Sequence, residues 1–296
     1  MYPRLSDLFR DLFGIAFPVT IYSFGVMVAT AILVGIWLAA REMDRKYEAG
    51  DVGGVEVGGG ARGRTKEASP SVLAGTLAVI AAGAGIVGAK LFTILGNPGR
   101  FLMSPGEMLF SMGGLTFYGG LIVAAGAIIW YLRRHDLTIP PIADAAAPSL
   151  MLAYGIGRVG CHLAGDGDWG IPADMAAKPD WLPMWLWGET YPNAIVGPPE
   201  QPVYPTSVYE AIAATLLFGV LWALRKHPYQ AGWLFSLYLV FNGVERFLIE
   251  KIRINPEYHL LGVTPTQAEL ISVVLVVGGL VGLVATWSRN ESGRGW

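Results

Sequence analysis

The chain has 296 residues, of which 53% are hydrophobic and only 15% are charged, and its mean hydropathy is positive. Soluble domains carry roughly a quarter charged residues, so this composition indicates a membrane protein. The net charge of -2 gives no reason to expect a nucleic acid as a partner, and the single cysteine, Cys161, excludes an internal disulfide and a metal site built from several thiolates.

Seven apolar stretches are long enough to cross a bilayer, which takes about 20 residues because the hydrocarbon core is roughly 30 Å thick. They predict an all-α, polytopic membrane protein in which residues 1–296 form a single domain. The first stretch lacks a small-residue cleavage site, so we expect a retained helix rather than a signal peptide. In chain order the seven stretches are 15–40, 72–95, 115–132, 140–165, 208–224, 231–250 and 268–287.

The loops between these stretches differ in charge. Of the 21 Lys and Arg residues, twelve fall on the side of the C-terminus, six on the opposite side and three within the stretches. Because cytoplasmic loops carry the excess of positive charge, we expect a bacterial inner-membrane protein with its N-terminus outside and its C-terminus in the cytoplasm. Segment 166–204, rich in Pro and Trp, is then a small periplasmic head or lid, whereas the Gly-rich segment 42–69 reads as a flexible inner connector.

Ionisable residues inside the apolar stretches are the first functional candidates. A charged group at bilayer depth costs about 2.5 kcal/mol or more, so it usually faces a polar interior. Arg158 and Arg246 each offer a planar fork of donors, and together they suit a phosphodiester. The alternative is structural pairing: Arg246 with Glu250, four residues later on the same helical face, and Arg158 with Asp144 or Asp166.

Two short patterns near Arg158 allow further interpretations. Asp166 and Asp168, separated by glycine, could bind a hard cation, but two carboxylates fall short of a calcium loop and a turn is the simpler reading. Cys161 and His162 are adjacent and point about 100 degrees apart on a helix, which favours a buried structural cysteine over a nucleophile–base pair. His162 remains a candidate proton acceptor near neutral pH. No metal or other cofactor is expected.

Several motifs then follow in a fixed order. On the seven-helix frame this ordered set resembles the prolipoprotein diacylglyceryl transferase family. The motifs are Gly88–Lys90, Gly113–Gly120, Asp144 at the start of the fourth stretch, Gly157–Gly160 followed by Gly165–Asp166 and Trp169–Gly170, Tyr204–Glu210, and Arg246 with Glu250.

The resemblance implies a transferase that moves the diacylglyceryl group of phosphatidylglycerol onto the lipobox cysteine in the signal peptide of a prolipoprotein and releases glycerol phosphate. It implies that Arg158 and Arg246 hold the donor's phosphodiester and that Glu250 orients Arg246. Membrane lipids are the surrounding partners. By the same resemblance, Tyr118 joins the catalytic positions, and the substrate-binding positions are Gly119, Gly120, Asp144, Cys161, Gly170, Asn242 and Glu250.

The chain departs from the family pattern at the expected proton acceptor. The family's histidine before Gly-Gly is Tyr118 here, its asparagine after the arginine motif is Cys161, and a tyrosine upstream of Arg246 is Asn242. Three outcomes are open: His162 or Asp166 acts as the base, which we favour; the thiol ionises in the field of the arginines; or the acceptor differs. The competing functions are a same-fold enzyme with another acceptor and a non-catalytic phospholipid-binding protein.

Overall fold

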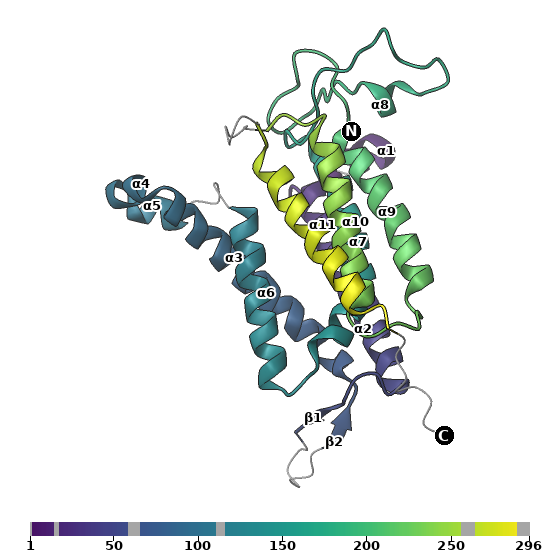
Figure 1. Ribbon diagram of the computed structural model, residues 1–296. Coiled ribbons are helices and arrows are strands. Elements are labelled where there is room, and N and C mark those ends of the chain that lie inside the picture. The colour runs from purple at the N-terminus through teal and green to yellow at the C-terminus, as the bar shows by residue number, and fades with distance from the viewer. Residues whose placement is uncertain (1, 15–17, 59–65, 111–115, 256–263, 289–296) are drawn as a thin grey trace. The chain divides into compact units, whose positions relative to one another are not determined.

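The computed structural model describes residues 2–14, 18–58, 66–110, 116–255 and 264–288, and these are mostly helical (Figure 1). The chain divides into two compact units. The first combines Met1–Leu38 with Ala143–Trp296, and the second is Ala39–Ile142. Two long helices, α2 (Ser23–Glu48) and α7 (Ile139–Ala164), run through the boundaries between the units.

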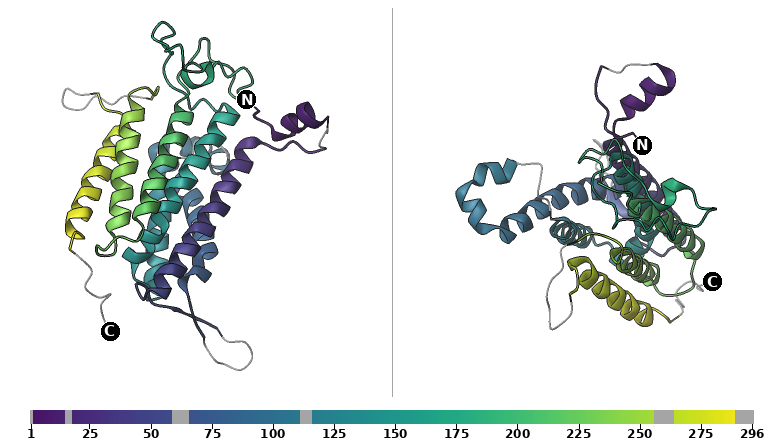
Figure 2. Two further views of the ribbon diagram at one scale, coloured as in Figure 1. Left: turned by 90° about the vertical axis from the view of Figure 1, so that its right-hand side faces the viewer. Right: turned by 90° about the horizontal axis from the view of Figure 1, so that it is seen from above.

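The first unit is a bundle of long helices. Besides α7 and the first part of α2, it contains α9 (Thr206–Leu224), α10 (Trp233–Glu250) and α11 (Gln267–Ala285), which lie side by side in Figures 1 and 2. A short N-terminal helix, α1 (Leu5–Phe13), precedes the bundle, and the one-turn helix α8 (Met184–Trp187) lies in the otherwise irregular segment 166–204. We call this segment, which joins α7 to α9, the head segment.

Small residues set the spacing of the bundle helices. A Cβ on Gly243 of α10 would lie 2.8 Å from the Ser272 carbonyl oxygen of α11, and one on Gly279 would lie 2.7 Å from that of Ser236. A Cβ on Gly155 of α7 would likewise come within 3.2 Å of Ala214 on α9. In lipid, such close backbone approach replaces the hydrophobic effect as the source of packing energy.

The N-terminus of α10 is held by a residue of α7. The Asp144 carboxylate is buried and accepts hydrogen bonds from the backbone N–H groups of Gly232 and Phe235, both at 2.8 Å. His227 Nε2 lies 3.6 Å from the same carboxylate. Asp144 thus lies at the end of α10 opposite to Arg246, and its expected role in substrate binding stays a prediction. Its negative charge there stabilises the positive end of the helix dipole.

The second unit is built around two helices, α3 (Ala74–Gly96) and α6 (Phe117–Arg134). The 3-10 turn η1 (Pro70–Leu73) precedes α3, and the short helices α4 (Pro98–Met103) and α5 (Pro105–Phe110) follow it. Gly119 and Gly120 are both buried, and a Cβ on Gly120 would lie 2.8 Å from the Gly85 carbonyl oxygen of α3. These two glycines allow α6 to pack closely on α3, and their expected part in a lipid pocket stays a prediction. The rest of their motif, residues 113–115, lies outside the described residues.

The Gly-rich inner connector is not wholly irregular. Its strands β1 (Val55–Val57) and β2 (Lys66–Ala68) form an antiparallel hairpin in which Val55 pairs with Ala68. The other regular elements of the described residues are helices, so the all-α expectation holds apart from this hairpin of two three-residue strands, which the sequence interpretation did not include. A three-residue strand is too short to show a period in a sequence that is also rich in glycine.

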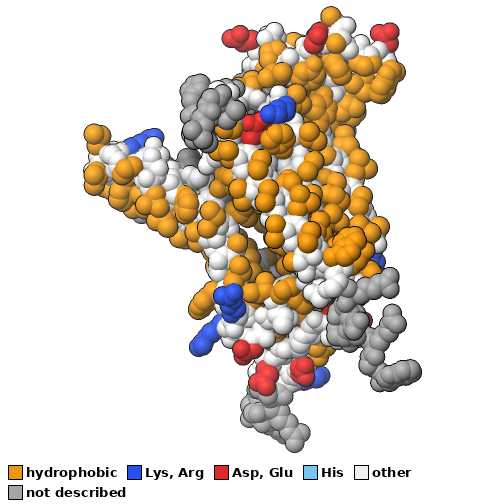
Figure 3. Space-filling view, viewed as in Figure 1, with side chains coloured by type: hydrophobic (Ala, Val, Ile, Leu, Met, Phe, Trp, Pro, Cys, Tyr) orange, Lys and Arg blue, Asp and Glu red, His pale blue; other side chains and the backbone are white. Residues whose placement is uncertain are grey.

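Within the described residues, four helical segments are long and apolar enough to cross a membrane: Ser23–Glu48, Pro70–Gly96, Thr206–Leu224 and Gln267–Ala285. Helices also form at the other three predicted stretches, as α6, α7 and α10. Hydrophobic side chains cover much of the visible face of the bundle (Figure 3). On α11, for example, Val274 and Val284 are 69% and 79% exposed, which suits a surface solvated by lipid.

Replacement of Asp144 by alanine should lower the free energy of unfolding by about 2–4 kcal/mol, because two buried N–H groups of α10 lose a charged acceptor. Asp144→Asn should lose less, since it keeps an acceptor oxygen. Denaturant unfolding of the detergent-solubilised protein, followed by tryptophan fluorescence, measures both. Asp180→Ala, at an exposed aspartate of the head segment, is the control and should not change the midpoint.

Candidate active site

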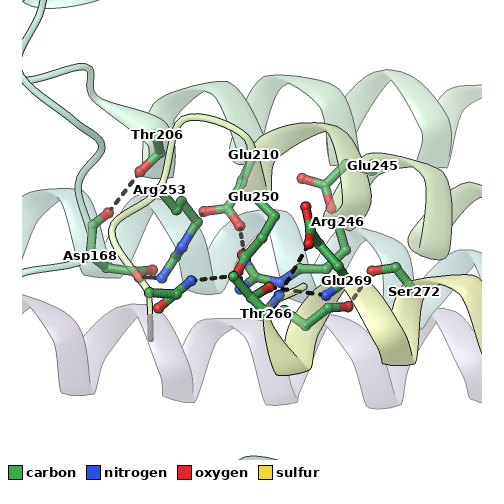
Figure 4. Close-up of polar contacts among 12 residues, drawn as sticks. Asp168, Thr206, Glu210, Glu245, Arg246, Glu250, Arg253, Thr266, Glu269 and Ser272 are labelled. Atoms are coloured by element: carbon green, nitrogen blue, oxygen red, sulfur yellow. Dashed lines mark hydrogen bonds and ion pairs between the residues drawn. The ribbon is translucent and has the colours of Figure 1, made fainter. Parts of the chain in front are cut away.

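Three arginines meet at one buried carboxylate. Glu210 of α9 is fully buried, and its carboxylate oxygens lie 3.6 Å from Arg158 Nε, 3.3 Å from Arg246 Nη1 and 3.3 Å from Arg253 Nη1. Arg158 is on α7, Arg246 is on α10, and Arg253 follows the end of α10 (Figure 4 labels Arg246 and Arg253). A single carboxylate therefore links α9 to two other helices and to the segment beyond α10.

Two more carboxylates complete the ion pairs. Asp168 of the head segment pairs with both Arg158 and Arg253. Glu250 Oε2 pairs with Arg246 Nη2 at 2.8 Å, and Asn255 Nδ2 donates to the other Glu250 oxygen at 2.7 Å. We call Arg158, Arg246, Arg253, Asp168, Glu210 and Glu250 the arginine cluster.

The position of Asp168 is set by backbone contacts of the head segment. Thr206 Oγ1 donates to the Asp168 carbonyl oxygen at 3.0 Å, and Gly170 forms a β-bridge with Arg253. The next residue continues the junction, since Ile171 N donates to the Ile252 carbonyl oxygen at 2.8 Å. A Cβ on Gly170 would lie 2.5 Å from that same oxygen. Position 170 therefore requires glycine for a close backbone approach.

A second layer of polar groups lies against Glu210. The Tyr154 hydroxyl donates to Glu210 Oε1 at 2.9 Å and also lies 3.4 Å from Glu245 Oε2. The Arg158 guanidinium stands over the Tyr154 ring, 5.0 Å from its centroid. The other Glu245 oxygen, Oε1, is buried and forms no hydrogen bond with any described residue.

The arginines and Asp168 are the accessible part of the cluster. The arginine side chains are 21%, 19% and 12% exposed for Arg158, Arg246 and Arg253, whereas those of Glu210 and Glu250 are fully buried. Guanidinium groups are always charged and bind planar anions through paired hydrogen bonds. The arrangement thus presents guanidinium donors backed by the buried carboxylates of Glu210 and Glu250, and such donors can hold an oxyanion and stabilise charge as it develops.

The two arginines singled out from the sequence do meet, through Glu210. The expected pairing of Arg246 with Glu250 is confirmed. The expected pairing of Arg158 with Asp144 or Asp166 is wrong, because Arg158 pairs with Asp168 and Glu210 instead.

Neither of the proposed proton acceptors, His162 and Asp166, forms an ion pair with the three arginines among the described residues. His162 Nδ1 is 3.2 Å from the Tyr191 hydroxyl of the head segment, and Tyr191 is almost fully buried. Burial raises the pKa of Tyr191, so its hydroxyl stays protonated. Asp166 is exposed, and its Oδ1 accepts from Asp168 N at 3.2 Å, which is the predicted turn. Cys161 is half-buried.

The remaining expected site residues are distributed over both units. Tyr118, Gly119 and Gly120 belong to α6 of the second unit, whereas Asn242 lies on α10, one turn before Arg246. Gly170 is at the junction described above.

The sequence interpretation included Glu210 only as the end of the Tyr204–Glu210 motif and gave it no role, and it missed Arg253 and the pairing role of Asp168. Glu210 is a carboxylate within an apolar stretch, which is the same signal that identified Arg158. Arg253 follows Arg246 by seven residues, which is two helical turns, so it continues the face that carries Glu250. The pairing of Asp168 has no local signal, because it depends on how the head segment folds back.

The chain is similar to proteins of known family. The family model described as prolipoprotein diacylglyceryl transferase matches residues 10–285. A phosphatidylglycerol–prolipoprotein diacylglyceryl transferase of Clostridium tetani is 29% identical over 278 residues, covering 93% of this chain and 96% of that protein. Proteins of the same name from Geobacillus kaustophilus and Vibrio vulnificus are 30% and 29% identical, over 94% and 98% of this chain and 91% and 94% of their own lengths.

Two glycine variants test the junction that positions Asp168. Gly170→Ala should lower the thermal unfolding temperature, because its Cβ would collide with the Ile252 backbone and separate the head segment from Arg253. Gly157→Ala, one residue from Arg158, is the matched control because no atom lies within 4 Å of its Cβ. Equal unfolding temperatures for the two variants would contradict the close approach at Gly170.

Proposed function

The chain belongs to the prolipoprotein diacylglyceryl transferase family, and we propose that it transfers the diacylglyceryl group of phosphatidylglycerol to the lipobox cysteine of a prolipoprotein, releasing glycerol phosphate. The observation that carries this proposal is the meeting of three partly exposed guanidiniums at one buried carboxylate. Each cation is costly to bury in an apolar bundle, so three of them at one place favour a functional role over a purely structural one.

In this proposal Arg158 and Arg246 bind the donor's phosphodiester. Arg253 shares Asp168 with Arg158, so an anion that binds these two guanidiniums takes the place of the Asp168 carboxylate. Asp168 suits an exchangeable partner, because it belongs to the head segment and is 17% exposed, whereas Glu210 and Glu250 are buried on helices. The carboxylate pair on Arg246, formed by Glu210 and Glu250, fixes the orientation of its fork.

The chemistry needs no nucleophile from this chain. The acceptor's sulfur attacks the glycerol carbon, the bond between that carbon and the phosphate oxygen breaks, and the electron pair leaves with glycerol phosphate. Negative charge on the phosphate rises as this bond breaks. Guanidiniums held in place beforehand stabilise that charge more in the transition state than in the ground state, which is the requirement for catalysis.

The proposed transfer from phosphatidylglycerol also implies how the protein lies in the membrane. We place α2, α3, α6, α7, α9, α10 and α11 across the bacterial inner membrane, with the N-terminus and the head segment on the periplasmic side. The distribution of Lys and Arg supports this orientation. The residues of the arginine cluster come from the C-terminal part of α7, the first turns of α9, the last turns of α10, the segment just beyond α10 and the head segment. The corresponding ends of these three helices lie next to the head segment (Figure 1). This is the depth expected for a phospholipid headgroup at the outer leaflet.

The direct test uses the purified protein, phosphatidylglycerol vesicles and a lipobox peptide. The wild-type protein should release glycerol phosphate and modify the peptide's cysteine, which mass spectrometry detects. Arg158→Ala and Arg246→Ala should each reduce the rate by about 100-fold or more, because each removes a donor aimed at the developing charge. Arg10→Ala, at a side chain that is 60% exposed, is the control and should keep the wild-type rate.

A second function is favoured by one observation, the replacement of the family's histidine and asparagine by Tyr118 and Cys161. It is the same donor chemistry toward an acceptor other than a lipobox cysteine. The same assay separates the two functions. Modification of the lipobox peptide supports the first, whereas arginine-dependent binding of phosphatidylglycerol without modification of the peptide supports the second.

A further inference from the structure

Glu245 of α10 is the one carboxyl group beside the arginine cluster that has no arginine partner among the described residues. It is only 9% exposed. Its Oε2 lies 3.4 Å from the Tyr154 hydroxyl, while Oε1 is buried without a hydrogen bond to any described residue. A buried carboxylate without a cation is costly, so such a group calls for a specific explanation. Figure 4 shows it beside Arg246 and near Glu210.

The charges around Glu245 do not balance. Three guanidiniums, on Arg158, Arg246 and Arg253, face three carboxylates that pair with them, on Asp168, Glu210 and Glu250. Glu245 is a fourth carboxyl group. A phosphodiester that takes the place of Asp168 leaves the three guanidiniums matched, so Glu245 still has no cation of its own, and the second charge that forms on the leaving phosphate is added beside it. An extra proton is most favourable on the carboxylate that no guanidinium neutralises, which is Glu245.

The groups that face Glu245 come from three helices. Tyr154 and Arg158 face it from α7, Glu210 faces it from α9, and Arg246 is its neighbour on α10. On the α11 side, α10 packs through Gly243 against Ser272 and Val276, neither of which is ionisable. The Tyr154 hydroxyl has one proton, which it donates to Glu210. Its oxygen can still accept a hydrogen bond from a protonated Glu245, which lies within reach.

We propose that Glu245 receives the proton of the acceptor thiol, and that Tyr154 is the positioning residue that holds it beside the arginine cluster. The inference rests on the proposed transferase function. In the step, the S–H bond breaks and its proton goes to Glu245 Oε1, while the sulfur's electron pair forms the bond to the glycerol carbon. The carbon–oxygen bond to the phosphate breaks, glycerol phosphate leaves with that electron pair, and Glu245 later returns its proton to water.

The other candidates are engaged elsewhere. His162 is hydrogen-bonded to Tyr191 of the head segment, and the exposed Asp166 accepts the backbone N–H of Asp168 in a turn. Glu210 accepts from Tyr154 and contacts all three arginines, so a proton there would weaken the contacts that hold the cluster together. Of these candidates, Glu245 is the one that lies beside the cluster and has a buried carboxylate oxygen, Oε1, without a hydrogen bond to any described residue.

The test is the pH dependence of transfer in the full-length protein with phosphatidylglycerol vesicles and the lipobox peptide. Glu245→Gln should lower kcat about 100-fold at neutral pH and leave KM for phosphatidylglycerol unchanged, because proton transfer is lost while the arginines remain. Its residual rate should rise about tenfold per pH unit up to about pH 8.5, where a free thiol ionises unaided. The wild-type rate should vary far less over this range.

Three further variants separate a chemical role from a structural one. Glu245→Asp should recover part of the kcat that Glu245→Gln loses. Tyr154→Phe should lower kcat several-fold, and the pH dependence of its rate should stay like that of the wild type rather than like that of Glu245→Gln. Glu42→Gln is the matched control, since Glu42 is also buried but pairs with Arg45 in the C-terminal part of α2, within the second unit, and it should behave as wild type. Thermal unfolding temperatures establish that each variant is folded.

Two results overturn the inference about Glu245. One is a Glu245→Gln variant with the wild-type kcat and pH profile. The other is a loss of rate that is independent of pH and accompanied by weaker binding of phosphatidylglycerol, which would make Glu245 a structural residue. A wild-type protein that releases no glycerol phosphate is a different result: it removes the transferase function and the inference together.

Discussion

The ion pairs of Glu210 are the interaction on which the rest of the first unit depends. Its fully buried carboxylate contacts arginines from α7, from α10 and from the segment beyond α10. Without it, the three arginines would keep only Asp168 and Glu250 as partners, which leaves one positive charge unmatched in a weakly screening interior. Removal of one partner of a buried pair destabilises far more than the pair itself stabilises. The helices of this bundle are therefore constrained to one arrangement by a charge balance as well as by packing.

Helix α10 is held in position by contacts at its N-terminus, along its side and near its C-terminus. Asp144 fixes its N-terminus through two backbone hydrogen bonds. Gly243 and Gly279 bring α10 and α11 into backbone contact. Near its C-terminus, Arg246 and Glu250 lie one turn apart on the same face, and Arg253 follows shortly beyond the end of the helix. Because the helix is held at its start and along its side, a rotation that displaced Arg246 would also break contacts more than two turns away.

The sequence predicted the positions of the long helices, because apolar runs and helical periods are local properties. It also predicted a functional role for Arg158 and Arg246. An arginine within an apolar stretch is rare, and it can be recognised from the sequence before its neighbours in space are known. It did not predict the partners. Asp168 reaches Arg158 and Arg253 only because the head segment pairs with the chain after α10, and Asp144 reaches Gly232 only because α7 lies beside α10. The hairpin of β1 and β2 was missed because three-residue strands carry no readable pattern.

The four carboxyl groups near the three arginines divide by how they are held, and this division has a chemical consequence. Glu210 and Glu250 are buried on helices and keep the guanidiniums in place whether or not a ligand is bound. Asp168 belongs to the head segment and neutralises the two arginines that an incoming anion would otherwise meet. Glu245 pairs with no described cation. On the proposed function, a phosphodiester that took the place of Asp168 would keep the guanidiniums neutralised, so only the second charge, which forms as the ester bond breaks, would be left to be balanced. A proton that moves to Glu245 removes one negative charge from the same small volume. The site can therefore pass through the reaction without a large change in its net charge, which a buried and weakly solvated cluster requires.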